Sequence, residues 1–201
     1  MPIAVDYYFA PQSPWAYLGH QRFWDMARAA KAEVAVLPID LGGRVFPNSG
    51  GLPLAKRAPQ RLTYRLQELR RFSEHLNAPL HLEPQYFPVA GDDAAKLILA
   101  VAMHDGAEAA MAISGAVLRA VWAEQRNIAN ESVLSALLAE QGLLARRLED
   151  AHSQAAHERY ETATAQALAA GVFGAPTYAI AGELFWGQDR LGFVERRLAK
   201  G

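Results

Sequence analysis

The chain opens with two apolar runs on either side of one amphipathic stretch. Ile3–Phe9 is β-branched and aromatic on both faces apart from one aspartate, which is typical of a buried strand. Ser13-Pro14 has the form of a helix start, and the helix is predicted to continue over residues 15–31. Glu33–Asp40 predicts a second strand, at a sheet edge because its proline cannot donate to a ladder. Together these segments predict a β-α-β unit with parallel strands.

Helical periodicity dominates the middle of the chain. Apolar residues recur at intervals of three and four from Pro59 to Leu76, which predicts an amphipathic helix. Plausible caps and apolar spacing predict four further helices, at residues 92–105, 108–124, 131–141 and 153–170. Leu41–Arg57 is rich in glycine and proline and is predicted to be irregular, and His81–Val89 is predicted to be an extended connector. A long loop inside a compact domain is more often functional than accidental.

The pattern returns to strands near the C-terminus. Thr177–Ala181 and Glu183–Trp186 are two short apolar segments around Ala181-Gly182, which predicts a hairpin. Leu191–Lys200 then predicts a closing helix. The predicted order is therefore βαβ, a long all-helical segment, and ββα, which is an α/β fold.

Composition narrows the classes of function. The 201 residues, half of them hydrophobic, suffice for one domain or one domain with a sizeable insertion. Twenty basic residues against 21 acidic ones leave no basic stripe, so we expect no nucleic-acid partner. The longest apolar run, near Leu97–Met103, is too short to span a bilayer, and the first residues lack a signal-peptide pattern. We therefore expect a cytoplasmic protein without a membrane partner.

Cysteine is absent from the chain. This absence excludes a disulfide framework, a thiolate metal site, a cysteine nucleophile and dithiol redox chemistry by the protein itself. The six histidines show no ligand spacing on one helix face, so we expect no metal site.

Three short motifs could carry chemistry. Ser13 at a helix start could stabilise a thiolate, but an ordinary N-cap is the favoured interpretation of this residue alone. Pro176 precedes a short strand and could follow a cis bond, although most X-Pro bonds are trans. Asp189 could take an ammonium group beside amides that hold a carboxylate, or it could cap the last helix. Taken singly, each motif favours the structural interpretation.

A basic stretch follows the long loop. The arginines of residues 61–71 are predicted to lie on the solvated side of their helix. An anionic substrate meeting the N-terminal end of this helix, with Lys56 and Arg57, is the alternative.

The element order and the motifs together resemble the thioredoxin fold with the inserted helical domain of the DsbA-like group. The resemblance places the thioredoxin-like domain at residues 1–42 and 171–201, and the helical insertion domain at residues 43–170. Redox members open the first helix with Cys-x-x-Cys, where this chain has Ser13-Pro14-Trp15-Ala16.

Within this group the chain is similar to the 2-hydroxychromene-2-carboxylate isomerases and to the related kappa-class glutathione transferases. The matching segments are Asp6–Phe9 (DYYF), Ser13–Leu18 (SPWAYL), Pro53–Arg57 (PLAKR), Gly171–Tyr178 (GVFGAPTY) and Gly182–Leu191 (GELFWGQDRL). The family often has Asp-Phe or a similar pair before its Ser-Pro, whereas Ala10-Pro11-Gln12 stands here. We therefore expect the substrate side of the pocket to differ from that of the family.

The resemblance implies a glutathione site. Ser13 would hydrogen-bond the glutathione thiol and favour its thiolate, and Ala175, before a cis Pro176, would pair its backbone with the cysteinyl part. Gln188 and Asp189 would hold the γ-glutamyl end. Two further ligand contacts are implied in the long loop, at Asn48 and Lys56.

The implied activity is a glutathione-dependent isomerisation of a small aromatic carboxylate in naphthalene-type aromatic catabolism. The reaction would interconvert 2-hydroxychromene-2-carboxylate and trans-o-hydroxybenzylidenepyruvate by reversible addition of the thiolate to a conjugated double bond. A kappa-class-like glutathione transferase and a non-catalytic thioredoxin-like binding module are the alternatives. The resemblance also implies a homodimer.

Overall fold

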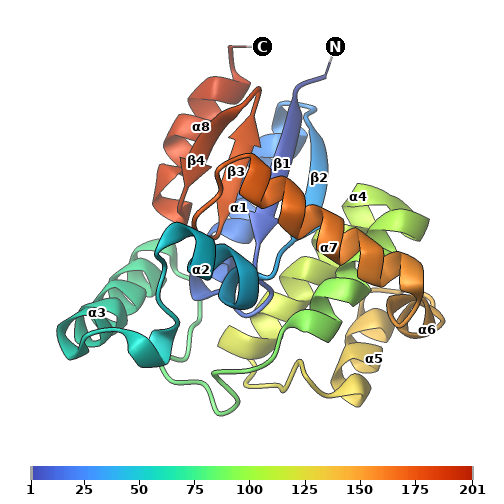
Figure 1. Cartoon of the computed structure of the whole chain (residues 1–201), viewed down its shortest axis with the longest axis horizontal. Helices are drawn as coiled ribbons and strands as arrows, with labels where there is room; N and C mark the ends of the chain where they lie inside the picture. The colour runs from blue at the N-terminus through green and yellow to red at the C-terminus, as the bar shows by residue number, and fades with distance from the viewer. Residues whose placement is uncertain (1, 201) are drawn as a thin grey trace.

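A four-stranded mixed sheet forms one half of the molecule in the computed structural model, which describes residues 2–200 (Figure 1). The strands lie in the order β2-β1-β3-β4. β1 (Ala4–Phe9) pairs in parallel with β2 (Glu33–Pro38), whereas β3 (Thr177–Ile180) is antiparallel to both β1 and β4 (Glu183–Trp186). The predicted parallel pairing and the edge position of the proline-bearing strand are both confirmed.

The predicted hairpin is also confirmed. Ala181 and Gly182 join β3 to β4 with φ angles of 50° and 81°. Two consecutive left-handed residues are the signature of a tight turn whose twist suits a two-stranded ribbon.

The sheet buries both faces against helices, as its nearly unbroken apolar strands require. Tyr7 and Tyr178 lie on the face that packs against α1 (Pro14–Ala29), α4 (Asp92–Trp122) and α8 (Leu191–Leu198), in the larger core. Tyr8 and Ala179 belong to a smaller core on the other face, with α7 (Gln154–Ala169). Successive side chains of a strand point to opposite faces, so each strand contributes to both cores.

α4 consists of two helical arms that meet at a kink. Gly106 interrupts it with φ 86° and ψ 178°, a conformation that glycine adopts without a steric penalty. The helices predicted over residues 92–105 and 108–124 are the two arms of this element. By length and composition α4 is apolar enough to cross a membrane, but half of its apolar window is buried inside the fold, as in the core helix of a globular protein.

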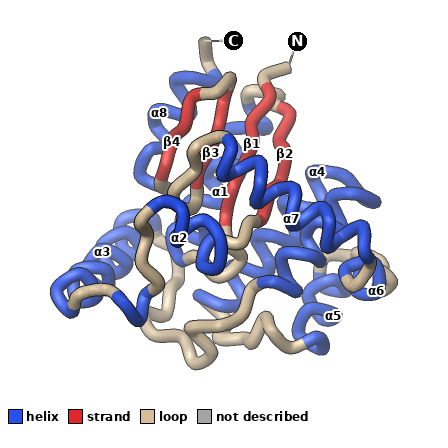
Figure 2. Tube along the Cα trace, viewed as in Figure 1, coloured by secondary structure: helices blue, strands red, loops and turns tan. Residues whose placement is uncertain are grey.

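The remaining helices surround the lower end of the sheet (Figure 2). α3 (Pro59–Leu76) and α5 (Glu131–Glu140) confirm two predicted helices. Between residues 41 and 57, where the sequence predicts irregular chain, the structure has a π-helix at Leu41–Val45, α2 at Phe46–Ser49 and a 3-10 helix at Leu54–Lys56. That prediction was wrong for most of the segment, because such short helices lack a full period of apolar positions.

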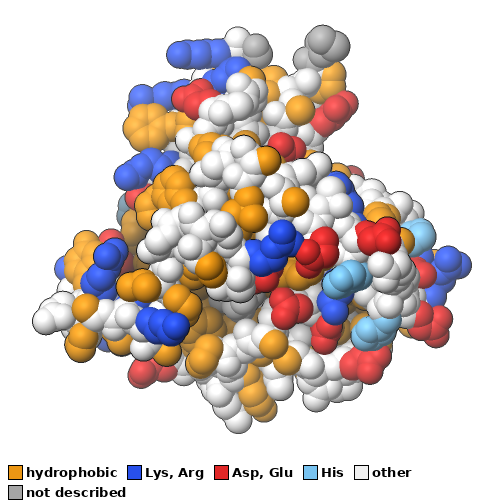
Figure 3. Space-filling view, viewed as in Figure 1, with side chains coloured by type: hydrophobic (Ala, Val, Ile, Leu, Met, Phe, Trp, Pro, Cys, Tyr) orange, Lys and Arg blue, Asp and Glu red, His pale blue; other side chains and the backbone are white. Residues whose placement is uncertain are grey.

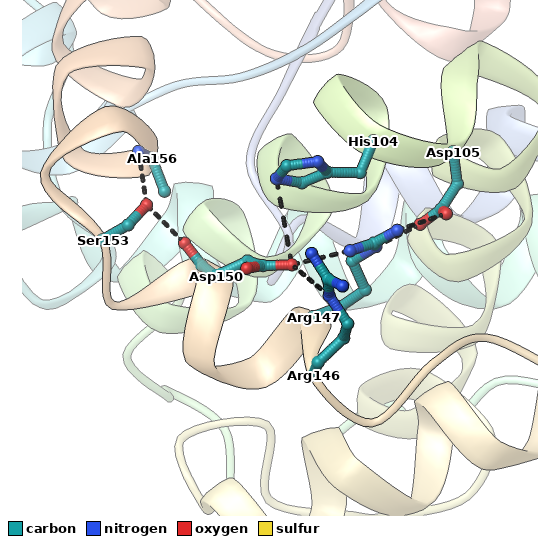
Figure 4. A network of polar contacts seen from close by, with 7 residues as sticks. All are labelled: His104, Asp105, Arg146, Arg147, Asp150, Ser153 and Ala156. Atoms are coloured by element: carbon teal, nitrogen blue, oxygen red, sulfur yellow. Dashed lines mark hydrogen bonds and ion pairs between the residues drawn. The ribbon is translucent and has the colours of Figure 1, made fainter.

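A second missed helix, α6 (Arg147–Ala151), is held by charge as well as by apolar packing, since Ala151 is buried in the larger core and Leu148 packs against that core. Arg147 donates to both oxygens of Asp105 at 2.6 and 2.7 Å and to Asp150 at 2.7 Å (Figure 4). The side chain of Arg147 is only 7% exposed, so this network fastens α6 to α4 beside the kink at Gly106.

Candidate active site

The strand register brings four distant segments to one end of the sheet. Tyr8 pairs with Thr177, and Thr177 pairs with Trp186. The chain that leaves β1, the chain that enters β3 and the chain that leaves β4 therefore share this end. β2 also ends here because it runs parallel to β1. The structure thus assembles the Ser13 turn, segment 41–57, Ala175-Pro176 and Gln188-Asp189 around one site.

Ser13 caps α1 with its side-chain oxygen, and this bond leaves its hydroxyl hydrogen unused. Its Oγ accepts from the Ala16 N–H at 3.2 Å, and its own N–H donates to the Ala10 carbonyl at 2.9 Å. No acceptor for the Ser13 hydroxyl hydrogen occurs among residues 2–200. The capping and the chemical interpretations are therefore compatible, because one lone pair serves the cap while the O–H remains free to donate to an anion.

The peptide bond between Ala175 and Pro176 is cis. Within the described residues the backbone N–H and carbonyl of Ala175 make no hydrogen bond, whereas the Pro176 carbonyl accepts from Gly187 at 2.9 Å. Ahead of this bond, a Cβ on Gly174 would lie 2.3 Å from the Trp186 indole nitrogen, so the close approach requires glycine. The geometry leaves one residue of main chain open to pair with an extended peptide.

Gln188 and Asp189 lie in a 3-10 turn ahead of α8. Gln188 is 2% exposed, and its Oε1 accepts from the Arg22 guanidinium at 3.1 Å, so its side-chain oxygen already has a partner inside the protein. Asp189 makes an ion pair with Arg190 at 2.6 Å and makes no side-chain hydrogen bond at the start of α8. The alternative interpretation of Asp189 as a helix cap is therefore wrong, because the 3-10 turn separates its carboxylate from the helix.

Asn48 and Lys56 lie at the exposed rim of the same end. Asn48 Nδ2 donates to the Arg44 carbonyl within its own turn at 2.7 Å, and Lys56 ends the short 3-10 helix. The neighbouring Ser49 Oγ lies 3.3 Å from the Phe173 carbonyl, two residues ahead of Ala175. This contact brings the rim to the segment that enters the cis bond, but it joins neither Asn48 nor Lys56 to Ser13.

A buried histidine fixes α1 from behind. His20 Nε2 lies 2.9 Å from the Met111 carbonyl, and its Nδ1 lies 3.2 Å from the Tyr7 hydroxyl. A carbonyl only accepts, so Nε2 carries the hydrogen and Nδ1 accepts from tyrosine. Burial lowers the pKa of His20 to about 4 and raises that of Tyr7 above its usual range. The pair is a neutral anchor between β1, α1 and α4 rather than an acid–base couple facing a ligand.

A basic residue near the site was misread from the sequence. Arg65 is half-buried, not solvated, with its guanidinium 5.4 Å from the Phe87 ring and 5.7 Å from the Trp122 ring. The Trp122 indole N–H donates at 3.3 Å to the carbonyl of Gln12, the residue before Ser13. Arginine positions on one helix face were visible in the sequence, but the aromatic partners come from distant segments.

Comparisons with known proteins agree on the family. The model of the DSBA-like thioredoxin domain matches residues 4–199. Curated proteins named 2-hydroxychromene-2-carboxylate isomerase are similar over nearly their whole length: that of Sphingobium xenophagum is 28% identical over 199 residues, covering 98% of this chain and 99% of the relative. That of Pseudomonas putida is 32% identical over 206 residues, covering 98% of this chain and 94% of the relative.

Solved structures extend the agreement to the fold. A structure of 2-hydroxychromene-2-carboxylate isomerase superposes with a TM-score of 0.81 at 30% identity, covering 98% of this chain and 95% of that one. The cytosolic disulfide reductase DsbM of Pseudomonas aeruginosa has a TM-score of 0.71 at 20% identity, with 99% and 100% covered, and shares the fold alone.

Proposed function

Because the chain belongs to the 2-hydroxychromene-2-carboxylate isomerase family of DSBA-like thioredoxin domains, we propose that it is a glutathione-dependent isomerase. It would interconvert 2-hydroxychromene-2-carboxylate and trans-o-hydroxybenzylidenepyruvate. One observation carries the glutathione requirement: a cysteine-free chain places a nearly buried serine with an uncommitted hydroxyl hydrogen at a helix start. A site built to stabilise a thiolate, without a thiol of its own, fits a thiol that arrives with a ligand.

The residues at this end of the sheet fit glutathione. Its peptide backbone could pair with the free N–H and carbonyl of Ala175, beside the cis Pro176. We propose that further contacts come from the rim and the 3-10 turn, at Asn48, Lys56, Gln188 and Asp189. When bound, glutathione would supply the thiolate that adds reversibly to a conjugated double bond of the substrate.

The protein's own contribution is electrostatic and geometric. The Ser13 hydroxyl would donate to the sulfur anion, and the start of α1 adds its partial positive charge and the N–H of Trp15, which has no acceptor within residues 2–200. Both effects favour the thiolate over the thiol and lower the thiol pKa. His20 and Tyr7 keep α1 seated on the sheet, so the donors are fixed before the ligand arrives.

One other observation supports the glutathione requirement. DsbM, which shares the fold, has also been solved with GSH, with a TM-score of 0.70 at 20% identity. We also propose that the protein is cytoplasmic and, from its resemblance to the isomerase family, that it is a homodimer acting on a small aromatic carboxylate.

The test is an absorbance assay of 2-hydroxychromene-2-carboxylate with and without glutathione. Rapid equilibration that needs glutathione and leaves its concentration unchanged supports the isomerase. Consumption of glutathione by an electrophile that retains the sulfur, without isomerisation, would instead identify a transferase of the kappa type. Binding of glutathione with neither reaction would identify a binding module.

A further inference from the structure

Two half-buried arginines, Arg57 and Arg65, lie at and after the end of segment 41–57 in the chain. Arg57 follows the 3-10 helix of segment 41–57, and Arg65 lies two turns further along the chain, in α3. Arg57 lies over the Phe46 ring at 5.9 Å, and its Nε donates to the Leu52 carbonyl at 2.9 Å. Burial and the positive charge of Arg57 lower the pKa of Arg65 to about 10. Burial is the larger cause of this lowered pKa, and the charge of Arg57 adds to it.

No carboxylate within residues 2–200 compensates this charge. Neither Arg57 nor Arg65 makes an ion pair in that part of the chain, although Arg71 of the same helix pairs with Glu68. Taking unpaired charges out of water is costly, and stacking on aromatic rings offsets only part of that cost. The arrangement is therefore suited to a bound anion that completes it.

Arg65 is joined to the Ser13 turn, and Arg57 to the cis-proline segment. From Arg65 the link passes through Trp122, whose indole donates to the Gln12 carbonyl. From Arg57 it passes through Phe46 in α2, whose last residue, Ser49, contacts the Phe173 carbonyl. Trp15 of α1 also packs edge-on against Phe72 of α3, at 6.2 Å between ring centroids. Figure 3 shows basic and hydrophobic side chains together at the lower left, where Figure 1 places α3.

We propose that Arg57 and Arg65 form the binding site for the carboxylate of an aromatic acid. The inference rests on the proposed function in taking that acid to be the isomerase substrate. A guanidinium presents two parallel N–H donors that match a carboxylate, which a single point charge does not. The partly exposed rings of Phe46 and Phe87, each beside a guanidinium, provide flat apolar surface for the rest of a planar ring.

The substrate fits this site better than glutathione does. Both ligands carry carboxylates, but glutathione has no aromatic ring to use the surfaces of Phe46 and Phe87. Its backbone is already assigned to the open main chain of Ala175. The arginine pair would therefore select carboxylated over neutral aromatic molecules without affecting the binding of the thiol.

Calorimetry with the stable analogue chromone-2-carboxylate tests the site without requiring turnover. The wild type should bind this acid at least tenfold more tightly than neutral chromone, and Arg65→Gln should lose that preference. Arg70→Gln is the matched control, since Arg70 is exposed on the same helix and has no ion pair within residues 2–200. Equal affinity of the wild type for acid and neutral compound overturns the proposal, whatever the isomerase assay shows.

Titration with glutathione shows whether the two arginines bind the carboxylate of the aromatic substrate or a carboxylate of glutathione. Arg65→Gln should bind glutathione as the wild type does while its KM for the substrate rises about tenfold or more. A loss of glutathione affinity with an unchanged affinity for chromone-2-carboxylate would overturn the proposal and assign the arginines to the cofactor. If Arg65→Gln does not fold, Arg57→Gln and Arg65→Lys serve instead. Arg65→Lys keeps the charge but not the paired donors, so it should also weaken the acid selectively, and full retention would contradict the proposal.

Discussion

α1 and α7 begin with the same serine cap, but the hydroxyl hydrogens of the two serines differ in their partners. Each helix begins with a serine whose Oγ accepts from the N–H three residues later at 3.2 Å, at Ser13–Ala16 and at Ser153–Ala156. The hydroxyl of Ser153 also donates to the Asp150 carbonyl at 2.6 Å (Figure 4). The hydroxyl of Ser13 has no such acceptor in the described part of the chain.

The difference teaches that a cap alone does not identify a site. At α7 both functions of the hydroxyl are satisfied inside the protein, next to the Arg147 network. At α1 the donor function is left over, at the end of the sheet where Ala175 also leaves main-chain groups open. A hydroxyl hydrogen without an acceptor in the protein, rather than a position at a helix start, therefore distinguishes a serine that can bind a ligand from a serine that only caps a helix.

The largest effect is expected from Ser13→Ala. Removing one preorganised donor to a developing anion commonly costs a factor of about 10²–10³ in turnover. We therefore expect the glutathione-dependent isomerase rate to fall by this factor and the pKa of bound glutathione, followed by thiolate absorbance, to rise. Ser153→Ala, which loses the same cap, should keep both properties. Equal rates in the two variants would remove the distinction between the helices.

The next effect concerns pH and the anchor behind α1. His20 has a pKa of about 4 when folded, against about 6.5 when unfolded, so the unfolded chain binds the extra proton between these values. Stability is therefore complete above about pH 6.5 and is lost as the pH falls toward 4. The expected loss is about 2 kcal/mol by pH 5, out of a total of about 3 kcal/mol.

Urea unfolding near neutral pH and at about pH 5 measures this loss. His20→Gln can bridge the same tyrosine and carbonyl without titrating, so its stability should change much less over this interval. His157→Gln, at an exposed histidine of α7 that makes no ion pair within residues 2–200, is the control and should follow the wild type. An identical acid response in all three proteins would show that His20 is not the titrating group.

A smaller effect is expected where charges fasten α6 to α4, next to the start of α7. Arg147→Gln leaves Asp105 and Asp150 without their shared partner and should lower the urea midpoint. Arg146→Gln is the matched control, because Arg146 is exposed and lies 3.7 Å from Asp150. Neither change should alter the thiolate pKa of bound glutathione. A shift of that pKa would mean that the two helix starts are coupled.

The smallest effect is the cap itself. Ser13→Ala should cost about 1 kcal/mol of stability, because it removes one bond to an orphan N–H group, and Ser153→Ala should cost more, because it also removes the hydrogen bond to the Asp150 carbonyl. Urea midpoints converted with a common slope give the two values. A markedly larger loss for Ser13 would indicate a structural role in place of the spare donor.

Much of this architecture is predictable because it depends on local patterns. The runs at Ile3–Phe9 and Thr177–Ala181 are short and apolar, as is typical of buried strands. Ser13-Pro14 marks the start of a helix. α6 and the short helices of segment 41–57 were missed because each is too short to show a repeating apolar period, although Val45 and Ala151 are buried in the cores.

The site was predictable only in part, for a related reason. Ser13 and Pro176 are visible as local motifs, but their meeting depends on the register between β1 and β3. The environment of Arg65 depends on Phe87 and Trp122, which the fold brings from other segments. Helical periodicity assigns Arg65 to a polar face, and only the tertiary structure shows which rings cover that face.

The absence of cysteine has a practical consequence for every experiment on this molecule. Thiol-selective reagents such as iodoacetamide find no target on the chain, so in its mixture with glutathione they report on the small molecule alone. The rate of alkylation against pH then titrates the sulfur directly, without a background from the protein. A single cysteine introduced at the Ala181-Gly182 turn, at the end of the sheet away from Ser13, would likewise be the only site for a spectroscopic label.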